Sequence, residues 1–345
     1  MQNRSDWVDY AKAIGILLVV YGHVARGLYN AGIKIPIEVF KLADSIVYSF
    51  HMPLFFFISG LFFYSSFSKR GGKKLLLNKV DTIVYPYLVW SILQGTVEVL
   101  LSNYTNGELS YSEVFNLLWS PRAHFWFLYA LFVVFIVASA LFSIVSKKLA
   151  AFIFLLSGIA YIYPSMLPQG LVFKFISQNF IFFVFGIVFS LHFKDKNLSS
   201  YKFLILSACS FFLVQFLFHS TFHYSYLDKG LFSLLLAIVS IIFVISVSSY
   251  VSVKPNKLLS LIGASSMAIY LMHILAGSGI RVVASNFFHL DSFIIHLILG
   301  CAVSVLAPLL ALQFINKLKI KYVFSAPISN LLIFLYTKLS KPLIK

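Results

Sequence analysis

Apolar runs long enough to cross a bilayer recur along almost the whole chain, and they limit its possible folds most strongly. A transmembrane helix needs about 20 predominantly apolar residues. The runs predict about ten such helices, near residues 8–28, 45–66, 80–101, 123–146, 149–167, 176–193, 201–220, 230–252, 259–283 and 292–315. Only 11% of the 345 residues are charged, against about 25% in soluble domains. We therefore expect an all-α, polytopic membrane protein.

The net charge of +16 is concentrated in short segments between these runs. Alternate segments carry the basic residues Lys69, Arg70, Lys73, Lys74, Lys79, Lys147, Lys148, Lys194, Lys196, Lys202, Lys254, Lys257, Lys317, Lys319 and Lys321. The remaining segments carry fewer cations and hold Glu38, Asp44, Glu108, Glu113, Asp228 and Asp291. Because cytoplasmic loops are enriched in Lys and Arg, both termini are predicted to be cytoplasmic. The cations form no stripe with interleaved aromatics, so a nucleic-acid partner is not expected.

The chain is expected to contain one membrane domain, residues 1–320, followed by a cytoplasmic or interfacial tail, residues 321–345. Within this tail, residues 328–340 are predicted to form an amphipathic helix held at the membrane surface by anionic lipid. The first run is interpreted as an uncleaved span, because Asp6 and Asp9 occupy what would be the basic leader of a signal peptide. The two cysteines, Cys209 and Cys301, predict neither a disulfide framework nor a thiolate metal site.

Lys12 and His23, both in the first apolar run, are the strongest candidates for a functional site. At 3.6 residues per turn they face one side of the helix, roughly 16 Å apart along its axis. A cation and an imidazole within a membrane helix are costly unless they line a cavity. The simpler interpretations are a positive-inside anchor for Lys12 and a helix–helix hydrogen bond for His23, and we favour the functional one.

Two further runs contain polar residues that suit either a structural or a ligand-binding role. In the second run, Ser59 and Gly60 suit either close helix packing or the wall of a ligand site. His51 in the same run suits either a substrate contact or a bond to a carbonyl. In the ninth run, Tyr270 and His273 share a polar face, and His273 either lines a cavity with His23 or bonds to a neighbouring helix.

The fourth run begins with Arg122, His124 and Trp126. A cation beside an imidazole at a membrane boundary suits an oxygen-rich ligand such as a sugar. Trp126 also suits the aromatic belt found at membrane interfaces. Glu98, near the end of the third run, is expected to pair with one of the cationic side chains. The connection over residues 102–122 is the longest, and long loops often carry binding function.

In this order, these motifs resemble the acyltransferase-3 family of integral membrane O-acyltransferases, and most closely its fucose 4-O-acetylase-like branch. The first helix of that family carries Arg or Lys, ten residues, and then His, which Lys12 and His23 match, with Asp9 in the preceding acidic position. The segments 49–60, 124–128 and 266–273 are similar to later motifs of the branch. Where many members carry two arginines before a proline, this chain has only Lys79 ahead of Pro86.

The resemblance implies transfer of an acyl group, with acetyl-CoA as the cytoplasmic donor, to a hydroxyl of a glycan or lipid-linked sugar at the inner membrane. It implies catalytic roles for Asp9, Lys12 and His23, and donor binding by Lys12, Ser59, Lys73, Lys74 and Lys79. It further implies acceptor contacts from His51, Glu98, Arg122, His124, Trp126, Tyr270 and His273. His23 either takes the hydroxyl proton or is transiently acylated. No spacing typical of zinc ligands is present, and no metal is expected.

A transporter or flippase for a glycan or small solute is the alternative function. Buried histidines and a basic pocket also suit proton-coupled transport. However, the sequence lacks paired interrupted helices in corresponding halves, which are the usual sign of a transporter. A purely structural partner in an export complex would leave Lys12 and His23 without a role. Release of CoA distinguishes the enzyme from the transporter.

Overall fold

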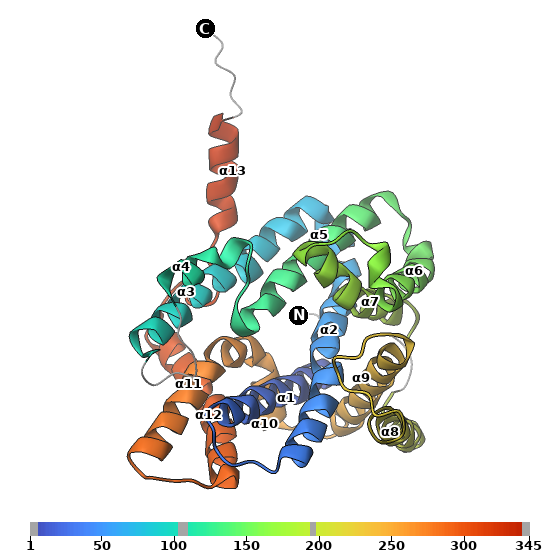
Figure 1. Ribbon diagram of the computed structural model, residues 1–345. Coiled ribbons are helices and arrows are strands. Elements are labelled where there is room, and N and C mark those ends of the chain that lie inside the picture. The colour runs from blue at the N-terminus through green and yellow to red at the C-terminus, as the bar shows by residue number, and fades with distance from the viewer. Residues whose placement is uncertain (1–5, 103–109, 194–197, 340–345) are drawn as a thin grey trace.

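The computed structural model describes residues 6–102, 110–193 and 198–339, so Glu108, Lys194 and Lys196 lie outside the described residues. Within these ranges the chain forms helices and turns without strands, which confirms the all-α prediction (Figure 1). Eight helical segments of the described chain are long and apolar enough to cross a membrane. The protein is therefore a multi-pass membrane protein, and one of these segments, Ile37–Leu100, contains two of the ten predicted spans.

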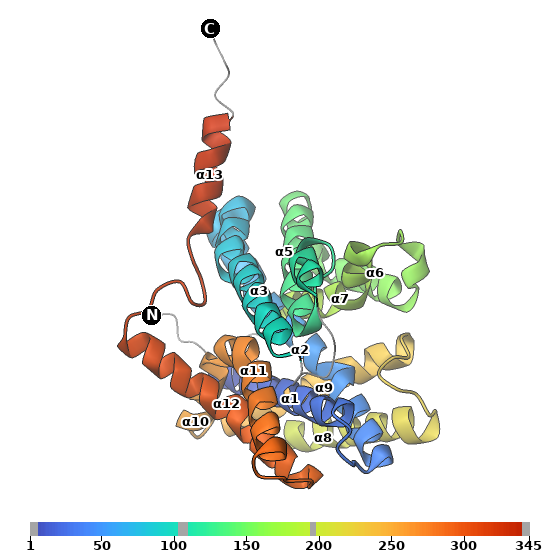
Figure 2. The same ribbon diagram turned by 60° about the vertical axis from the view of Figure 1, so that its left-hand side comes forward.

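Helix α1 (Asp6–Asn30) carries Lys12 and His23 and lies among the other helices of its half of the bundle (Figures 1 and 2). It contacts α2, α9, α10, α11 and α12. Its buried residues are mostly small or aliphatic, including Ala11, Ile16 and Val20. Small side chains let neighbouring helices approach closely, which suits a helix surrounded by protein.

The second and third predicted spans form one helical run with a sharp break inside it. The run comprises α2 (Ile37–Lys79), a π-helix η1 (Val80–Val84) and α3 (Tyr85–Leu100). Gly71 has a φ of +74°, a conformation that glycine adopts at little cost. The prediction of a basic loop between these spans is therefore wrong. The chain changes direction at Gly71, and the basic residues on both sides of it are helical.

Two other predicted spans also differ from the observed helices. Helix α6 (Ala150–Ile162) has only 13 residues, so it is about 20 Å long and does not reach spanning length. The predicted span 259–283 is divided at Ser265 into α10 (Lys257–Ala264) and α11 (Ser266–Asn286). Apolar composition alone marks neither of these interruptions.

The remaining helices agree with the apolar runs to within a few residues. They are α5 (Trp126–Ile144), α7 (Leu171–His192), α8 (Tyr201–Phe216), α9 (Leu231–Val251) and α12 (Phe293–Lys317). The predicted connection 102–122 contains a further short helix, α4 (Tyr111–Phe115). A helix predicted in the tail is present as α13 (Ile328–Leu339), which projects away from the bundle in both views (Figures 1 and 2).

Helices α2 and α7 cross with their backbones in contact. A Cβ atom on Gly60 would lie 1.9 Å from the carbonyl oxygen of Phe183, and one on Gly186 would lie 2.1 Å from that of Phe57. Only glycine permits this approach. Gly60 therefore serves helix packing, while its neighbour Ser59 lies in the wall of a cavity.

Candidate active site

Three histidines from separate elements of the fold meet beside α1. His23 comes from α1, His124 from the short turn before α5, and His273 from α11. The ring centroid of His23 lies 5.2 Å from that of His273 and 5.8 Å from that of His124, and the latter two are 5.1 Å apart. His124 and His273 are buried, whereas His23 is only partly buried by its neighbours.

The hydrogen bonds of these rings determine which nitrogens are available. His273 Nδ1 lies 2.8 Å from the carbonyl oxygen of Tyr270, which only accepts, so Nδ1 carries the proton and Nε2 keeps its lone pair. That Nε2 has no hydrogen-bond partner among the described residues, and neither has either ring nitrogen of His124. Buried polar atoms without partners are rare, so these nitrogens are candidates for substrate contact.

Tyr270 holds the cluster together from one side. Its hydroxyl donates to the backbone carbonyl of His124 at 2.5 Å, and its ring centroid lies 5.0 Å from the His124 ring. The bond joins α11 to the turn before α5, so it fixes His124 relative to His273. On the other side, the Ser304 hydroxyl donates to the His273 carbonyl at 3.0 Å.

A cavity of about 350 Å³ reaches the cluster at Tyr270, while none of the three histidines is among its lining residues. Most of its wall is apolar, and Tyr270 belongs both to this wall and to the surroundings of the histidines. Three residues predicted to bind the donor, Lys12, Ser59 and Lys79, also line it. The structure therefore brings these three side chains together from α1 and from both arms of the helical run around Gly71.

The two cavity lysines occupy different environments. Lys12 Nζ lies 3.2 Å from Asp9 Oδ1, so the acidic residue that precedes it in the first-helix motif is in contact with it. Lys79 Nζ lies 4.4 Å from the ring centroid of Phe135, within the range of a cation–π interaction. Lys73 and Lys74 are exposed and lie outside the cavity wall.

A second, partly buried polar group lies near the end of α3. Arg122 forms an ion pair with Glu98, which also accepts from Gln94 Nε2 at 3.0 Å. The expected pairing of Glu98 with a nearby cation is thus present. Two other guanidinium nitrogens of Arg122, Nε and Nη1, are buried without a partner among the described residues. Trp126 stacks on Phe175 of α7 at 6.0 Å and makes no ring contact with the three histidines.

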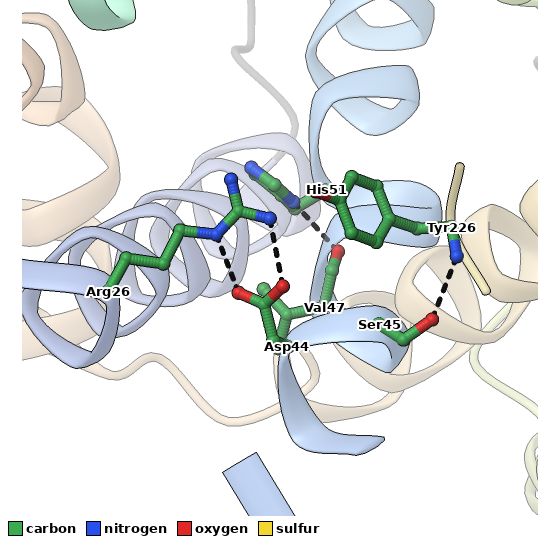
Figure 3. Close-up of polar contacts among 6 residues, drawn as sticks. All are labelled: Arg26, Asp44, Ser45, Val47, His51 and Tyr226. Carbon is green, nitrogen blue, oxygen red and sulfur yellow. Dashed lines mark hydrogen bonds and ion pairs between the residues drawn. The ribbon is translucent and has the colours of Figure 1, made fainter. Parts of the chain in front are cut away.

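Sequence reasoning missed a polar group on the opposite side of His23. Arg26 forms a bidentate ion pair with Asp44, at 2.7 and 2.8 Å (Figure 3). Its Cζ lies 3.3 Å from the ring centroid of Tyr48. Asp44, expected in an external loop, instead lies buried in α2. One sequence signal could have indicated this group: Arg26 follows His23 by three residues and therefore lies on the same face of the helix.

Tyr48 connects this ion pair to two histidines. Its ring centroid lies 6.4 Å from that of His23 and 4.6 Å from that of His51. His51 Nδ1 lies 2.7 Å from the carbonyl oxygen of Val47, so the bond to a carbonyl considered for this residue is present (Figure 3). The Tyr48 hydroxyl is buried and has no partner among the residues that the structure describes.

Comparison with known proteins identifies the domain. A family model described as "Acyltransferase domain" matches residues 5–313. "Glucans biosynthesis protein C" of Salmonella schwarzengrund is 26% identical over 215 residues, or 52% of this chain and 56% of the relative. "Nodulation protein NolL" of Sinorhizobium fredii is 23% identical over 223 residues, which cover 60% of this chain and 55% of the relative. The chain thus spans about half the length of these curated relatives. Comparison with solved structures found no match.

The match extends from α1 through most of α12. It therefore contains the three-histidine cluster and both cavity lysines, together with the helices that position them. Its length, close to the whole chain, does not depend on any single motif. The protein belongs to the acyltransferase-3 family, and its helices are those of a multi-pass membrane protein.

Proposed function

We propose that the protein transfers an acetyl group from cytoplasmic acetyl-CoA to a hydroxyl of a cell-surface or exported glycan, with His23 as general base. One observation carries the proposal: a cavity with two lysines in its wall shares Tyr270 with the surroundings of a cluster of three histidines. The family supports acyl transfer, and the name of one relative, which refers to glucan biosynthesis, supports a glycan acceptor.

The cavity suits the acyl-pantetheine part of the donor. At about 350 Å³ it lies near the lower end of the range for ligand pockets, roughly 300–1,000 Å³, and its wall is mainly apolar. Lys12 and Lys79 would neutralise phosphate charge. The nucleotide would then remain at the predicted cytoplasmic surface, where Lys73 and Lys74 are exposed. Lys12 and His23 lie roughly 16 Å apart along α1, a distance that the extended arm would cover.

In the chemical step, a neutral nitrogen of His23 takes the proton of the acceptor hydroxyl. The hydroxyl oxygen bonds to the thioester carbonyl carbon, and the carbon–sulfur bond then breaks. The leaving thiolate receives the proton from the imidazolium, which restores the neutral ring. General-base assistance of this kind contributes typically about 10²–10⁴-fold to the rate.

His273 has a positioning role in this scheme. Its Nδ1 is committed to a backbone carbonyl, so its Nε2 is an acceptor close to His23. A hydrogen bond from His23 to that nitrogen would fix the His23 tautomer, leaving the other His23 nitrogen free for the hydroxyl proton. His124, Arg122 and His51 are proposed to contact the acceptor.

The proposal is tested with purified protein in lipid nanodiscs and labelled acetyl-CoA. Release of CoA is measured with and without a panel of sugars and lipid-linked glycans. His23→Gln is compared with His296→Gln, because His296 is a buried histidine of α12 whose Nε2 bonds to the Leu290 carbonyl and which does not belong to the cluster. We expect CoA release that an acceptor increases, that His23→Gln lowers by about 10²–10⁴-fold and that His296→Gln preserves.

Two results would contradict the proposal. The first is full activity in a correctly folded His23→Gln variant, which would remove His23 as the base. The second is translocation of a glycan without any CoA release, which would favour a transporter. Acid-quenched samples analysed by mass spectrometry distinguish direct transfer from transient acylation of His23.

A further inference from the structure

The segment that follows α12 folds back against the helical run that carries Lys79. Tyr85 donates its hydroxyl proton to the carbonyl of Tyr322 at 2.7 Å, and Trp90 Nε1 donates to the carbonyl of Val323 at 2.9 Å. The Trp90 ring stacks on Phe324, with centroids 6.1 Å apart and planes inclined by 7°. These contacts attach the connection between α12 and α13 to the start of α3 (Figure 2).

The strongest attachment lies at the start of α13. The backbone N–H of Ser329 donates to Asp81 Oδ1 at 2.8 Å, and its hydroxyl donates to Asp81 Oδ2 at 2.7 Å. The first N–H groups of a helix have no partners within the helix, and a negative charge near them is favourable. Asp81 therefore caps α13 from another part of the chain. Ser329 is only 6% exposed, so water has little access to this contact.

Asp81 belongs to the short π-helix η1, which also contributes to the donor cavity. Thr82 and Ile83 of η1 and the preceding Lys79 line that cavity. π-Helical turns are rare and frequently occur at functional sites, because they change the direction of side chains within a helix. The segment between α12 and the start of α13 thus holds Asp81, Tyr85 and Trp90. Residues next to Asp81 in η1 face the cavity.

We infer that residues 322–329, here called the C-terminal latch, position η1 so that Lys79 and Thr82 face the donor. The latch lies beyond residue 313, where the match to the acyltransferase domain ends, so it is a feature of this chain outside the matched region. The identity of the donor rests on the proposed function. Breaking the latch raises the KM for acetyl-CoA, while the KM for the acceptor and the kcat change little.

The test measures both KM values and kcat in three latch variants. Ser329→Ala removes one bond to Asp81, Trp90→Phe removes the bond to Val323 but keeps an aromatic ring, and a truncation after Leu318 removes the latch completely. Ser325→Ala is the matched control, because Ser325 is an exposed residue of the latch itself. Ser329→Thr keeps the hydroxyl and should behave like the wild type.

We expect the double variant Ser329→Ala with Trp90→Phe to raise the KM for acetyl-CoA about fivefold to tenfold, as the loss of two hydrogen bonds allows. Hydrogen exchange should become faster over residues 79–86. An unchanged acetyl-CoA KM and unchanged exchange in the double variant would overturn the inference, even if the truncated protein fails to fold. If the wild type shows no CoA turnover, the proposed function fails, and exchange over residues 79–86 still tests the latch.

Discussion

The three clustered histidines differ in how their ring nitrogens are held. His273 is fixed by its bond to the Tyr270 carbonyl, whereas both nitrogens of His124 are buried without partners among the described residues. His23 is the least buried of the three and lies on the same helix as Lys12. This arrangement favours His23 as the ring that meets the reacting hydroxyl, with the other two as fixed neighbours.

Replacing His23 with glutamine should lower kcat by about 10²–10⁴-fold, the range for loss of a general base. The KM for acetyl-CoA should change little, because the donor contacts proposed here lie at Lys12 and Lys79. Single-turnover kinetics with labelled donor measures the chemical step directly. A large KM change with an unaltered rate of chemistry would assign His23 to binding instead.

Replacing Tyr270 with phenylalanine should reduce kcat about fivefold while the protein remains folded. The change removes the hydroxyl that bonds to the His124 carbonyl, a hydrogen bond worth about 1 kcal/mol, and loosens the cluster. Tyr161→Phe is the control. It also removes one hydrogen bond of a buried tyrosine, the bond to Ser233, and Tyr161 does not belong to the histidine cluster. Equal loss of activity in both variants would show a general effect on stability.

At the scale of helices, glycine contacts set how closely the bundle packs. Gly60 and Gly186 bring the backbones of α2 and α7 together, and Gly263 does the same for α10 and α1, where a Cβ atom would lie 1.8 Å from the Asp9 carbonyl oxygen. Ser59, next to Gly60, lines the cavity, and Asp9 contacts Lys12. The contacts that hold the helices are thus adjacent to residues proposed to act on the donor.

Gly60→Ala should lower the unfolding midpoint, because α2 and α7 must separate to admit the methyl group. Overpacking of this kind typically costs about 1–3 kcal/mol. Gly279→Ala is the matched control, since Gly279 lies in α11 with open space around its Cα and alanine favours the helix. Thermal unfolding in detergent measures the midpoints of both variants. An unchanged midpoint for Gly60→Ala would mean that the helices do not cross at this distance.

Helical periodicity explains what could be predicted from the sequence and what could not. Lys12 and His23 share a face because both lie in one helix, and that relation needs no tertiary information. The meeting of His23 with His124 and His273 depends on packing between α1, α5 and α11, which no local pattern encodes. The break at Gly71 was missed for a related reason: composition marks where apolar runs end, but not whether the polar residues between them stay helical.

For the whole molecule, the distribution of lysines predicts that both termini lie in the cytoplasm. Asp291, between α11 and α12, would then face outward, and Lys254, between α9 and α10, would face inward. Both residues are exposed, so cysteines placed there should react with soluble reagents.

In a background lacking Cys209 and Cys301, Asp291→Cys should be labelled in intact cells by a membrane-impermeant maleimide. Lys254→Cys should be labelled only after the cells are opened. Labelling of both variants in intact cells, or the reverse pattern, would contradict the predicted orientation. It would also place Lys12 on the wrong side for a cytoplasmic donor.

The helix break at Gly71 has a consequence for how this site tolerates change in chain length. Ser59 precedes Gly71 by as many positions as Ile83 follows it, and both line one cavity, so the two arms are matched in register. One inserted residue would rotate the rest of its arm by about 100°. Lys79 would then turn away from the donor while every helix remained intact. The number of residues between Gly71 and Lys79 is therefore a fixed dimension of the site, as much as the identity of either residue.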